Sequence, residues 1–250
     1  MAIGHVRVGT GPRRVIALNG WFGAAHNWGG LTDLIDPDRF SYAFLDYRGY
    51  GSRRAETGEY TLAEIAGDTL ALADELGWER FALVGHSMGG AAIQRVYADA
   101  PDRVERLAGI SPVSAAGFPF DADGWALFDG AAADPAKRRQ IIDFTTGSRL
   151  TGRWLDAMAA FSTSTSDPKA FGAYLAAWAH ADFAAEVRGA AVPALAIAGE
   201  HDPALGPAWV ASTWCADYPN AESAVLTDAG HYGMFEAPVR LATLLERFLD

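Results

Sequence analysis

The stretch FALVGHSMGG, residues 81–90, decides the fold of this chain of 250 residues. Its first four residues form an apolar run that predicts a buried strand, and the small side chains of residues 91–98 predict a helix. Between them lies the pattern Gly-x-Ser-x-Gly, which in this setting is typical of a nucleophilic serine on a sharp turn. Gly85 and Gly89 let the strand and helix backbones come close, since neither has a Cβ atom. We therefore predict that Ser87 is a nucleophile above the edge of a sheet.

A serine hydroxyl is a weak nucleophile at neutral pH, so it needs a base and a group that orients the base. Residues 193–198 form another short apolar run, and Asp202 lies in the loop that follows it. Residues 223–226 form a further strand candidate, and His231 follows that one. Because the carboxyl ends of parallel strands meet at one edge of a sheet, we expect Ser87, Asp202 and His231 to lie together as a triad.

Two other carboxylates compete with Asp202 for the orienting role. Glu200 lies two residues earlier in the same loop, and Asp228 lies close to His231 in the sequence. We favour Asp202 because it falls just beyond the end of the predicted strand and is followed by Pro203.

The chain resembles the α/β-hydrolase superfamily in motifs that cover nearly all of it outside residues 114–189. The motifs are Leu18-Asn19-Gly20-Trp21, Asp46-Tyr47-Arg48-Gly49-Tyr50-Gly51, Gly85-His86-Ser87-Met88-Gly89-Gly90, Gly199-Glu200-His201-Asp202 and Gly230-His231. Within the superfamily the chain looks like the small single-domain esterases, lactonases, perhydrolases and carbon–carbon bond hydrolases. The resemblance implies an α/β fold with a mostly parallel central sheet, helices on both faces and a helical cap insertion. The order serine, acid, histidine is also that of this superfamily.

The resemblance extends to an oxyanion hole formed by the backbone N–H groups of Trp21 and Met88. The chain departs from the family pattern at two positions. Asn19 stands where the family usually has histidine, although an asparagine can still hydrogen-bond its own loop. Arg53 stands where the arginine-glycine loop usually ends with serine, and Ser52 lies one place earlier.

The rest of the chain alternates strand and helix patterns, which predicts a parallel sheet covered on both faces. Only residues 5–8 precede the first buried strand, so we expect a single short antiparallel strand at one edge. Thr61 followed by Glu64 forms a capping-box pattern before a predicted helix at 62–76, which Gly77 ends. Further strands are predicted at 15–18, 41–45 and 104–110, and further helices at 28–35, 208–216 and 239–249.

Residues 114–189 interrupt this alternation with several helix-like pieces and no clear strand. Asp134-Pro135 and Asp167-Pro168 are typical of a helix N-cap followed by proline at the first helical position. The polar tract at 161–166 predicts a loop. We expect residues 114–189 to form a helical cap, rich in aromatic side chains, on a core made of residues 1–113 and 190–250.

Composition excludes several classes of protein. A single cysteine, Cys215, excludes a disulfide framework and favours a reducing compartment, so we expect a cytoplasmic protein. Residues 1–8 lack the apolar core of a signal peptide, and no run of about twenty apolar residues could span a membrane. The formal net charge of −11 argues against nucleic acid and anionic membranes as partners. The remaining histidines lack the spacing of a metal site: His5, His26, His86, His180 and His201.

Our leading hypothesis is a cofactor-free serine hydrolase that cleaves a small hydrophobic carboxylic ester or lactone through an acyl-enzyme. The side chains of Trp21, Phe22 and Tyr232 are expected to face this small-molecule substrate. A perhydrolase related to the haloperoxidases and a carbon–carbon bond hydrolase share the same triad and remain alternatives. A ligand-binding receptor or sensor that retains the triad is an alternative of another class. The sequence leaves the oligomeric state open.

Overall fold

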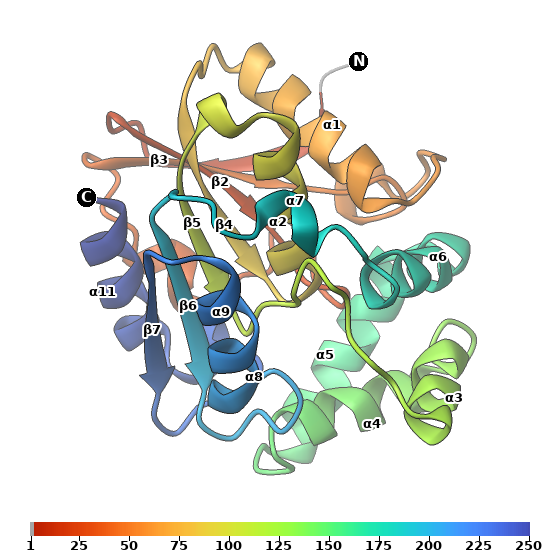
Figure 1. The fold of residues 1–250 in the computed structure, drawn as a ribbon. Coiled ribbons are helices and arrows are strands. Elements are labelled where there is room, and N and C mark those ends of the chain that lie inside the picture. Colours follow the sequence, from red (N-terminus) through yellow and green to blue (C-terminus); the bar gives the residue numbers. More distant parts are fainter. Residues whose placement is uncertain (1–2) are drawn as a thin grey trace.

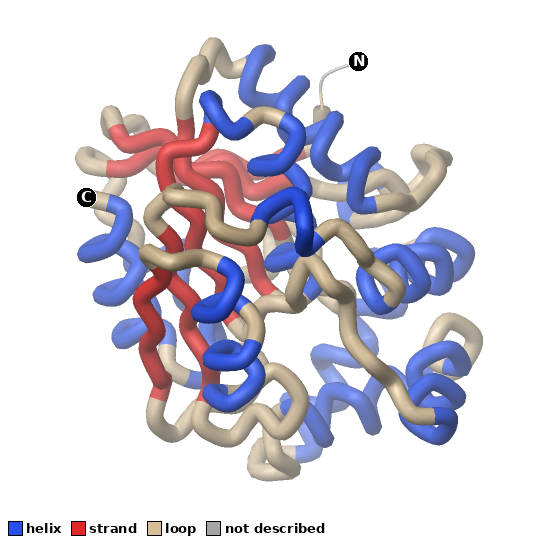
Figure 2. Tube along the Cα trace, viewed as in Figure 1, coloured by secondary structure: helices blue, strands red, loops and turns tan. Residues whose placement is uncertain are grey.

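The computed structural model describes residues 3–250, which form a seven-stranded sheet covered by helices on both faces (Figures 1 and 2). Along the sheet the strands follow the order β1-β3-β2-β4-β5-β6-β7. Their bounds are β1 His5–Val8, β2 Arg13–Leu18, β3 Phe40–Leu45, β4 Phe81–His86, β5 Val104–Ile110, β6 Ala194–Gly199 and β7 Ala221–Leu226. Strand β1 pairs antiparallel with β3, and the other neighbours pair parallel. The predicted mostly parallel sheet with one short antiparallel edge strand is confirmed.

Several strands are mostly apolar because helices cover both faces of the sheet. Every residue of β3, β4 and β6 is buried, as expected for parallel strands inside a layered α/β fold. The register places Gly85 opposite Leu18 on one side and opposite Gly109 on the other. The carboxyl ends of β2, β4 and β5 therefore lie together, and the loops that leave them meet at one edge of the sheet.

The helices of the core lie in two layers (Figure 1). One layer holds α1 Leu62–Glu75, α2 Met88–Asp99, α7 Ala184–Val187, α8 Pro207–Ser212 and α9 Trp214–Asp217, and the other holds α11 Pro238–Leu249 with the short helix Gly29–Leu34. A single turn, α10 Gly233–Glu236, precedes α11, and further short 3-10 turns span Gly51–Arg53 and Pro101–Arg103.

Helix α1 begins and ends as its sequence predicts, with one difference. The Thr61 hydroxyl accepts a hydrogen bond from the Glu64 amide at 3.1 Å, and Gly77 adopts a φ of +66° after the last turn. The Glu64 carboxylate does not return to Thr61 but accepts from the amides of Glu59 and Tyr60 at 3.0 and 2.9 Å. The carboxylate therefore fixes the chain that enters the helix, one and two residues further upstream than a capping box requires.

Residues 114–189 form helices between β5 and β6 and lie beside the carboxyl-end edge of the sheet (Figure 1). Besides α7 they are α3 Ala122–Gly130, α4 Pro135–Thr145, α5 Gly152–Thr165 and α6 Pro168–Ala179. The predicted N-caps of α4 and α6 are confirmed, because Asp134 accepts from the Ala136 amide and Asp167 from the Lys169 and Ala170 amides. The packing of these helices is uneven: α3 buries none of its 9 residues, whereas α6 buries 6 of its 12.

Three local predictions differ from the structure in type or in extent. The polar tract 161–166 is not a loop, because α5 continues to Thr165 and the hydroxyls of Thr163 and Thr165 bond the carbonyls four residues earlier. The expected helix at 208–216 is divided into α8 and α9 at Thr213, where φ is −118° and ψ is −84°. The expected helix at 28–35 is a 3-10 helix.

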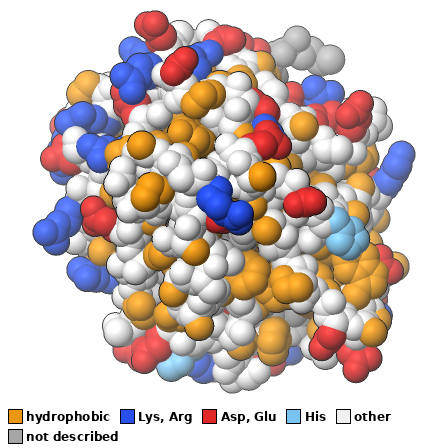
Figure 3. Space-filling view, viewed as in Figure 1, with side chains coloured by type: hydrophobic (Ala, Val, Ile, Leu, Met, Phe, Trp, Pro, Cys, Tyr) orange, Lys and Arg blue, Asp and Glu red, His pale blue; other side chains and the backbone are white. Residues whose placement is uncertain are grey.

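The surface is mixed in character. Figure 3 shows acidic and basic side chains interspersed over most of one face, with hydrophobic side chains gathered between α8 and α3. Within residues 3–250, no helix combines the length and the apolar character needed to cross a bilayer. In the same range, no three His, Cys, Asp or Glu side chains are grouped so that they could hold a metal ion. The prediction for residues 1–8 includes Met1 and Ala2, which lie outside the described residues.

Candidate active site

Ser87 occupies a strained turn between β4 and α2. Its φ of +54° and ψ of −117° lie outside the regions that a residue with a Cβ atom normally adopts. The turn is held on both sides, because the Ser87 amide donates to the Ile110 carbonyl at 3.0 Å and the Ser87 carbonyl accepts from Gly90 and Val113. A Cβ atom on Gly89 would overlap the carbonyl of Leu18, so the close approach requires glycine there. This is the sharp strand-to-helix turn that the sequence predicts.

Asp202 and His231 meet at the same edge of the sheet. The Nδ1 atom of His231 lies 2.7 Å from Oδ2 of Asp202, in the loops after β6 and β7. The other carboxylate oxygen accepts from the amides of Ala204 and Leu205, both at 3.0 Å. Burial raises the pKa of Asp202, but the charge and hydrogen bond of His231 and the two amides outweigh burial and hold that pKa below its usual range. The carboxylate therefore stays ionised at neutral pH and keeps the proton of the neutral imidazole on Nδ1.

The competing carboxylates take other positions. The Glu200 side chain is half exposed and lies 3.8 Å from His201, and its carboxylate accepts a long hydrogen bond from the Asp228 amide at 3.4 Å. Asp228 is an exposed turn residue with a φ of +60°. In the described part of the chain neither carboxylate hydrogen-bonds to His231, so the geometry favours Asp202 as the orienting acid.

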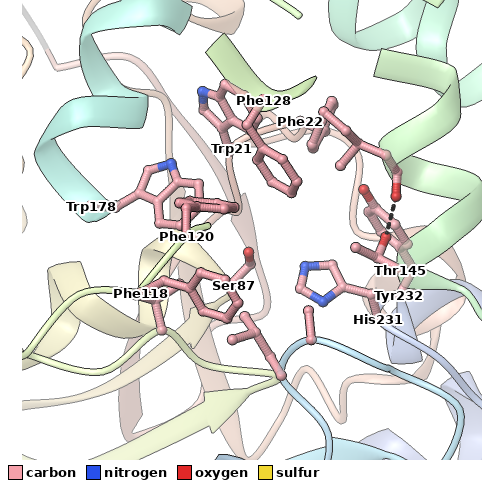
Figure 4. Close-up of a pocket in the computed structure, with 14 residues that line it drawn as sticks. Trp21, Phe22, Ser87, Phe118, Phe120, Phe128, Thr145, Trp178, His231 and Tyr232 are labelled. Carbon is pink, nitrogen blue, oxygen red and sulfur yellow. Dashed lines mark hydrogen bonds between the residues drawn. The ribbon is translucent and has the colours of Figure 1, made fainter. Parts of the chain in front are cut away.

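Ser87 and His231 face each other across one cavity (Figure 4). No hydrogen bond joins the Ser87 hydroxyl to His231 within residues 3–250. Such contacts are often long without a substrate and shorten when the reacting group is bound. The shared cavity nevertheless brings the predicted nucleophile and base to the same small space.

The backbone amide and carbonyl of His231 are both hydrogen-bonded. Its amide donates to the Thr145 carbonyl at 3.1 Å, and its carbonyl lies 2.9 Å from Nε2 of His86. A carbonyl only accepts, so Nε2 of His86 carries a proton. The Glu236 carboxylate accepts from both neighbouring amides, Gly230 at 2.8 Å and Tyr232 at 3.0 Å. Sequence reasoning missed Glu236, because a carboxylate five residues after a histidine carries no signal by itself.

The loop after β2 lies against the serine turn. A Cβ atom on Gly20 would be 2.6 Å from Nδ1 of His86 and 3.1 Å from Cβ of Ser87, so the glycine permits this contact. Trp21 follows, and in the described residues neither its amide nor that of Met88 donates to another protein group. The two predicted oxyanion donors are thus unpaired N–H groups beside Ser87. The Trp21 side chain points away from the sheet, and its Nε1 donates to the Phe171 carbonyl on α6 at 2.7 Å.

The two departures from the family pattern have local explanations. The Asn19 side chain donates to the Gly20 carbonyl at 3.0 Å, so it bonds its own loop as expected. Arg53 is buried, and its guanidinium bonds the carboxylates of Glu56 and Asp68, both at 2.8 Å. Ser52 supplies the hydroxyl from one position earlier, since its Oγ donates to Asp46 at 2.8 Å. Asn19 and Arg53 therefore stabilise loops and take no visible part in chemistry.

Aromatic side chains surround the cavity, which encloses about 430 Å³ of space, including the part open to solvent. The predicted substrate-facing residues Trp21, Phe22 and Tyr232 all line it (Figure 4). Other lining aromatics come from residues 114–189, where sequence reasoning noted their abundance without choosing among them; they are Phe118, Phe120, Phe128 and Trp178. Polar groups on the walls come from Ser87, Thr145, His231 and Tyr232. The surroundings of Ser87 are therefore mainly apolar.

Comparison with known proteins agrees with the fold. A relative from Pseudomonas putida, the dihydrolipoyllysine-residue acetyltransferase component of an acetoin cleaving system, is 28% identical over 96% of this chain. The chain spans 64% of that relative's length, and 29% and 34% of two other curated relatives.

Solved structures are similar over nearly the whole chain. A bromoperoxidase from Bacillus anthracis superposes with a TM-score of 0.88 at 19% identity, covering 98% of this chain and 94% of the other. An esterase from Exiguobacterium antarcticum superposes with a TM-score of 0.85 at 17% identity, covering 99% and 95%. At such identities the likeness concerns the fold. The model of the alpha/beta hydrolase fold family matches residues 13–238, and the chain belongs to that family.

Proposed function

We propose that the protein is a cofactor-free serine hydrolase acting on small, neutral, hydrophobic carboxylic esters or lactones. The observation that carries the proposal is the hydrogen bond of 2.7 Å between Asp202 and His231, whose ring lines the cavity that also holds Ser87 on its strained turn. The apolar walls favour an uncharged substrate, because a charged group would lose its hydration there without gaining a partner. In this proposal residues 114–189 are a cap on a core of residues 1–113 and 190–250.

The proposed reaction begins with attack of Ser87 Oγ on the ester carbonyl carbon. Nε2 of His231 takes the hydroxyl proton, and Asp202 stabilises the resulting imidazolium. The carbonyl oxygen becomes an oxyanion that the amides of Trp21 and Met88 bind, each donor contributing about 3 kcal/mol. Collapse of the tetrahedral intermediate breaks the bond to the leaving oxygen, which takes the proton from His231. A water activated by His231 then hydrolyses the acyl-enzyme and regenerates Ser87.

Labelling with a fluorophosphonate tests the nucleophile before any substrate is known. We expect one label per chain, on Ser87, and none in Ser87→Ala; the exposed Ser164 on α5 provides a matched control, because Ser164→Ala should label normally. A panel of neutral and anionic esters and lactones of similar size then tests the reaction. Labelling at another serine would overturn the triad, and equal efficiency for anionic members would overturn the apolar-pocket assignment.

The same panel, extended with hydrogen peroxide as an acyl acceptor and with a diketone, separates the alternatives that share the triad; cleavage of the diketone in preference to the esters would identify a carbon–carbon bond hydrolase. Acyl transfer to hydrogen peroxide in preference to water would identify a perhydrolase. Labelling of Ser87 without turnover of any ester, lactone or diketone would instead favour a receptor.

A further inference from the structure

A second cavity lies on the outer side of Phe118 and Phe120, in the surface between α3 and α8 where Figure 3 shows hydrophobic side chains gathered. It encloses about 1150 Å³, including open solvent, and is therefore larger than the cavity of Ser87. Trp125 and Trp209 form parts of its walls.

Phe118 and Phe120 line both cavities. On the inner side, the Phe120 ring packs 4.6 Å from Phe128 and 5.6 Å from Trp178, between centroids. On the outer side, Phe118 packs 5.1 Å from Trp209, and Phe120 packs 6.0 Å from Trp125. In Figure 4 both rings stand beside Ser87. The two side chains thus form a partition one residue thick between the proposed nucleophile and the outer cavity.

The segment that carries the partition is only partly buried. The Phe118 amide donates to the Ala179 carbonyl at 3.0 Å, and Gly117 before it has a φ of +73°. Both rings are half-buried, and the segment leads into α3, which buries none of its residues. Partly exposed rings of this kind can be displaced at lower cost than rings buried in the core.

The charges of the outer cavity do not suit an ionic ligand. The Asp121 carboxylate is engaged as the N-cap of α3, accepting from the Gly124 amide at 2.7 Å. The His180 ring stacks on Trp125 at 4.8 Å with an interplanar angle of 20°. The remaining surface is largely apolar and includes four aromatic rings, so it gains most from covering an apolar, uncharged group.

We propose that the outer cavity binds the distal apolar arm of a substrate whose carbonyl is held at Ser87, and that Phe118 and Phe120 determine how long that arm can be. This inference rests on the proposed hydrolase function. The substrates it names are neutral esters with an aromatic or extended alkyl arm, which lies between the two rings and reaches Trp125. Short esters fill only the inner cavity and do not extend past the two rings.

Two classes of variant should change chain-length preference in opposite directions. Phe118→Ala and Phe120→Ala join the cavities, so the ratio of kcat/KM for an octanoate over an acetate ester of the same alcohol should rise about tenfold. Trp125→Ala removes the outer contact, so the same ratio should fall about tenfold, a change worth 1.4 kcal/mol. A second series with acetate fixed and the alcohol lengthened shows whether the arm belongs to the acyl or the alcohol side. Phe144→Ala is the control, because Phe144 is 49% exposed on α4 and lines neither cavity.

Failure of this inference can be told from failure of the proposed function. Normal hydrolysis of the acetate ester, with both ratios unchanged in all three variants, would overturn the outer binding site alone. Absence of hydrolysis at every length would overturn the proposed function. If an alanine variant does not fold, Phe120→Leu and Trp125→Phe repeat the test with smaller changes. Labelling rates of short-chain and long-chain alkyl fluorophosphonates give a second readout that requires no turnover.

Discussion

Glu236 holds both backbone amides that flank His231, at 2.8 Å on the Gly230 side and 3.0 Å on the Tyr232 side. Its side chain is only 3% exposed, and it also lies 3.3 Å from the Arg149 guanidinium. One buried carboxylate therefore fixes the direction of the chain on either side of the proposed base. A glutamine has the same shape but offers one acceptor oxygen, so it leaves one of the two amides facing an N–H₂ group.

We expect Glu236→Gln to lower kcat for a short ester by up to about 100-fold, because a shift of about 1 Å in a reacting group has such an effect. KM should change little, since Glu236 does not line the cavity. The exposed Glu222 on β7 gives the control Glu222→Gln, which should behave as wild type. A folded Glu236→Gln protein with normal kcat would show that the bonds to these amides serve stability only.

The two carboxylates of the β6 loop should differ sharply. Asp202→Asn is expected to lower kcat by about four orders of magnitude, because an amide at this position can stabilise the wrong tautomer of His231 and carries no charge. Glu200→Gln should have little effect, since the Glu200 side chain is half exposed and lies beside His201, with no hydrogen bond to His231. Steady-state kinetics on both variants measures the difference, with circular dichroism to verify folding. A lower kcat for Glu200→Gln than for Asp202→Asn would show that Glu200 is the orienting acid.

His86 should make the fold sensitive to mild acid. Burial first, and then the neighbouring His231, lower the pKa of His86 from 6.5 to about 3. Between these values the unfolded chain binds a proton that the folded chain excludes, so stability falls as the pH falls through this range. The loss is up to about 1.4 kcal/mol per pH unit. The pKa of Asp202 is lowered from 3.8, so its contribution disappears only at lower pH.

Denaturant unfolding between about pH 4.5 and 7.5 measures this effect. His86→Gln keeps an N–H donor for the His231 carbonyl but cannot titrate, so its free energy of unfolding should depend less on pH. His26→Gln alters an exposed histidine and should keep the wild-type slope. If the free energy of unfolding depended on pH equally in wild type, His86→Gln and His26→Gln, His86 would accept its proton in the folded state.

Arg138 is a buried cation that lysine should replace less well than methionine. Its Nε donates to the Ala131 carbonyl at 2.9 Å, its Nη1 to Ser162 and Ser166, and its guanidinium lies 3.6 Å from the centre of the Phe171 ring. No carboxylate of residues 3–250 lies within 4.0 Å, and burial lowers its pKa. The planar group is stabilised by its three acceptors and by the aromatic ring.

Arg138→Lys keeps a buried charge but loses the planar stacking and the forked donors. Arg138→Met removes the charge and retains a contact between sulfur and the ring. We expect a lower Tm for the lysine variant than for the methionine variant, with both below wild type by several degrees. Thermal unfolding monitored by circular dichroism decides the order, and Arg139→Lys, on the exposed side of α4, is the control. A lysine variant as stable as wild type would mean that charge alone is required at this position.

Local patterns predicted the parts of the molecule that depend on neighbouring residues in the chain. The apolar run before Ser87 and the glycines around it specify the strand, the turn and the start of α2. The Asp-Pro pairs specify the starts of α4 and α6 in the same way. The order of Asp202 and His231 after successive strands predicted their meeting, because parallel strands bring their carboxyl ends together.

The features that the sequence did not predict depend on contacts between distant segments. The tract 161–166 is polar in composition, yet Ser162 and Ser166 contact Arg138 on another helix, which no local pattern reveals. Glu236 acquires its role only when the His231 loop folds back over it. The choice of Phe118 and Phe120 among many aromatics depends on which helices pack together.

The bond from the Trp21 indole to the Phe171 carbonyl ties α6 to the residue whose amide is proposed to bind the oxyanion. A swing of α6 away from the sheet would carry that amide with it and dismantle the hole. In the proposed hydrolase we therefore expect the motion that admits a substrate to involve α3, which buries none of its residues, and not α6. If the proposed function holds, we expect the α6 side of residues 114–189 to stay in place during turnover while the α3 side moves to exchange molecules with solvent.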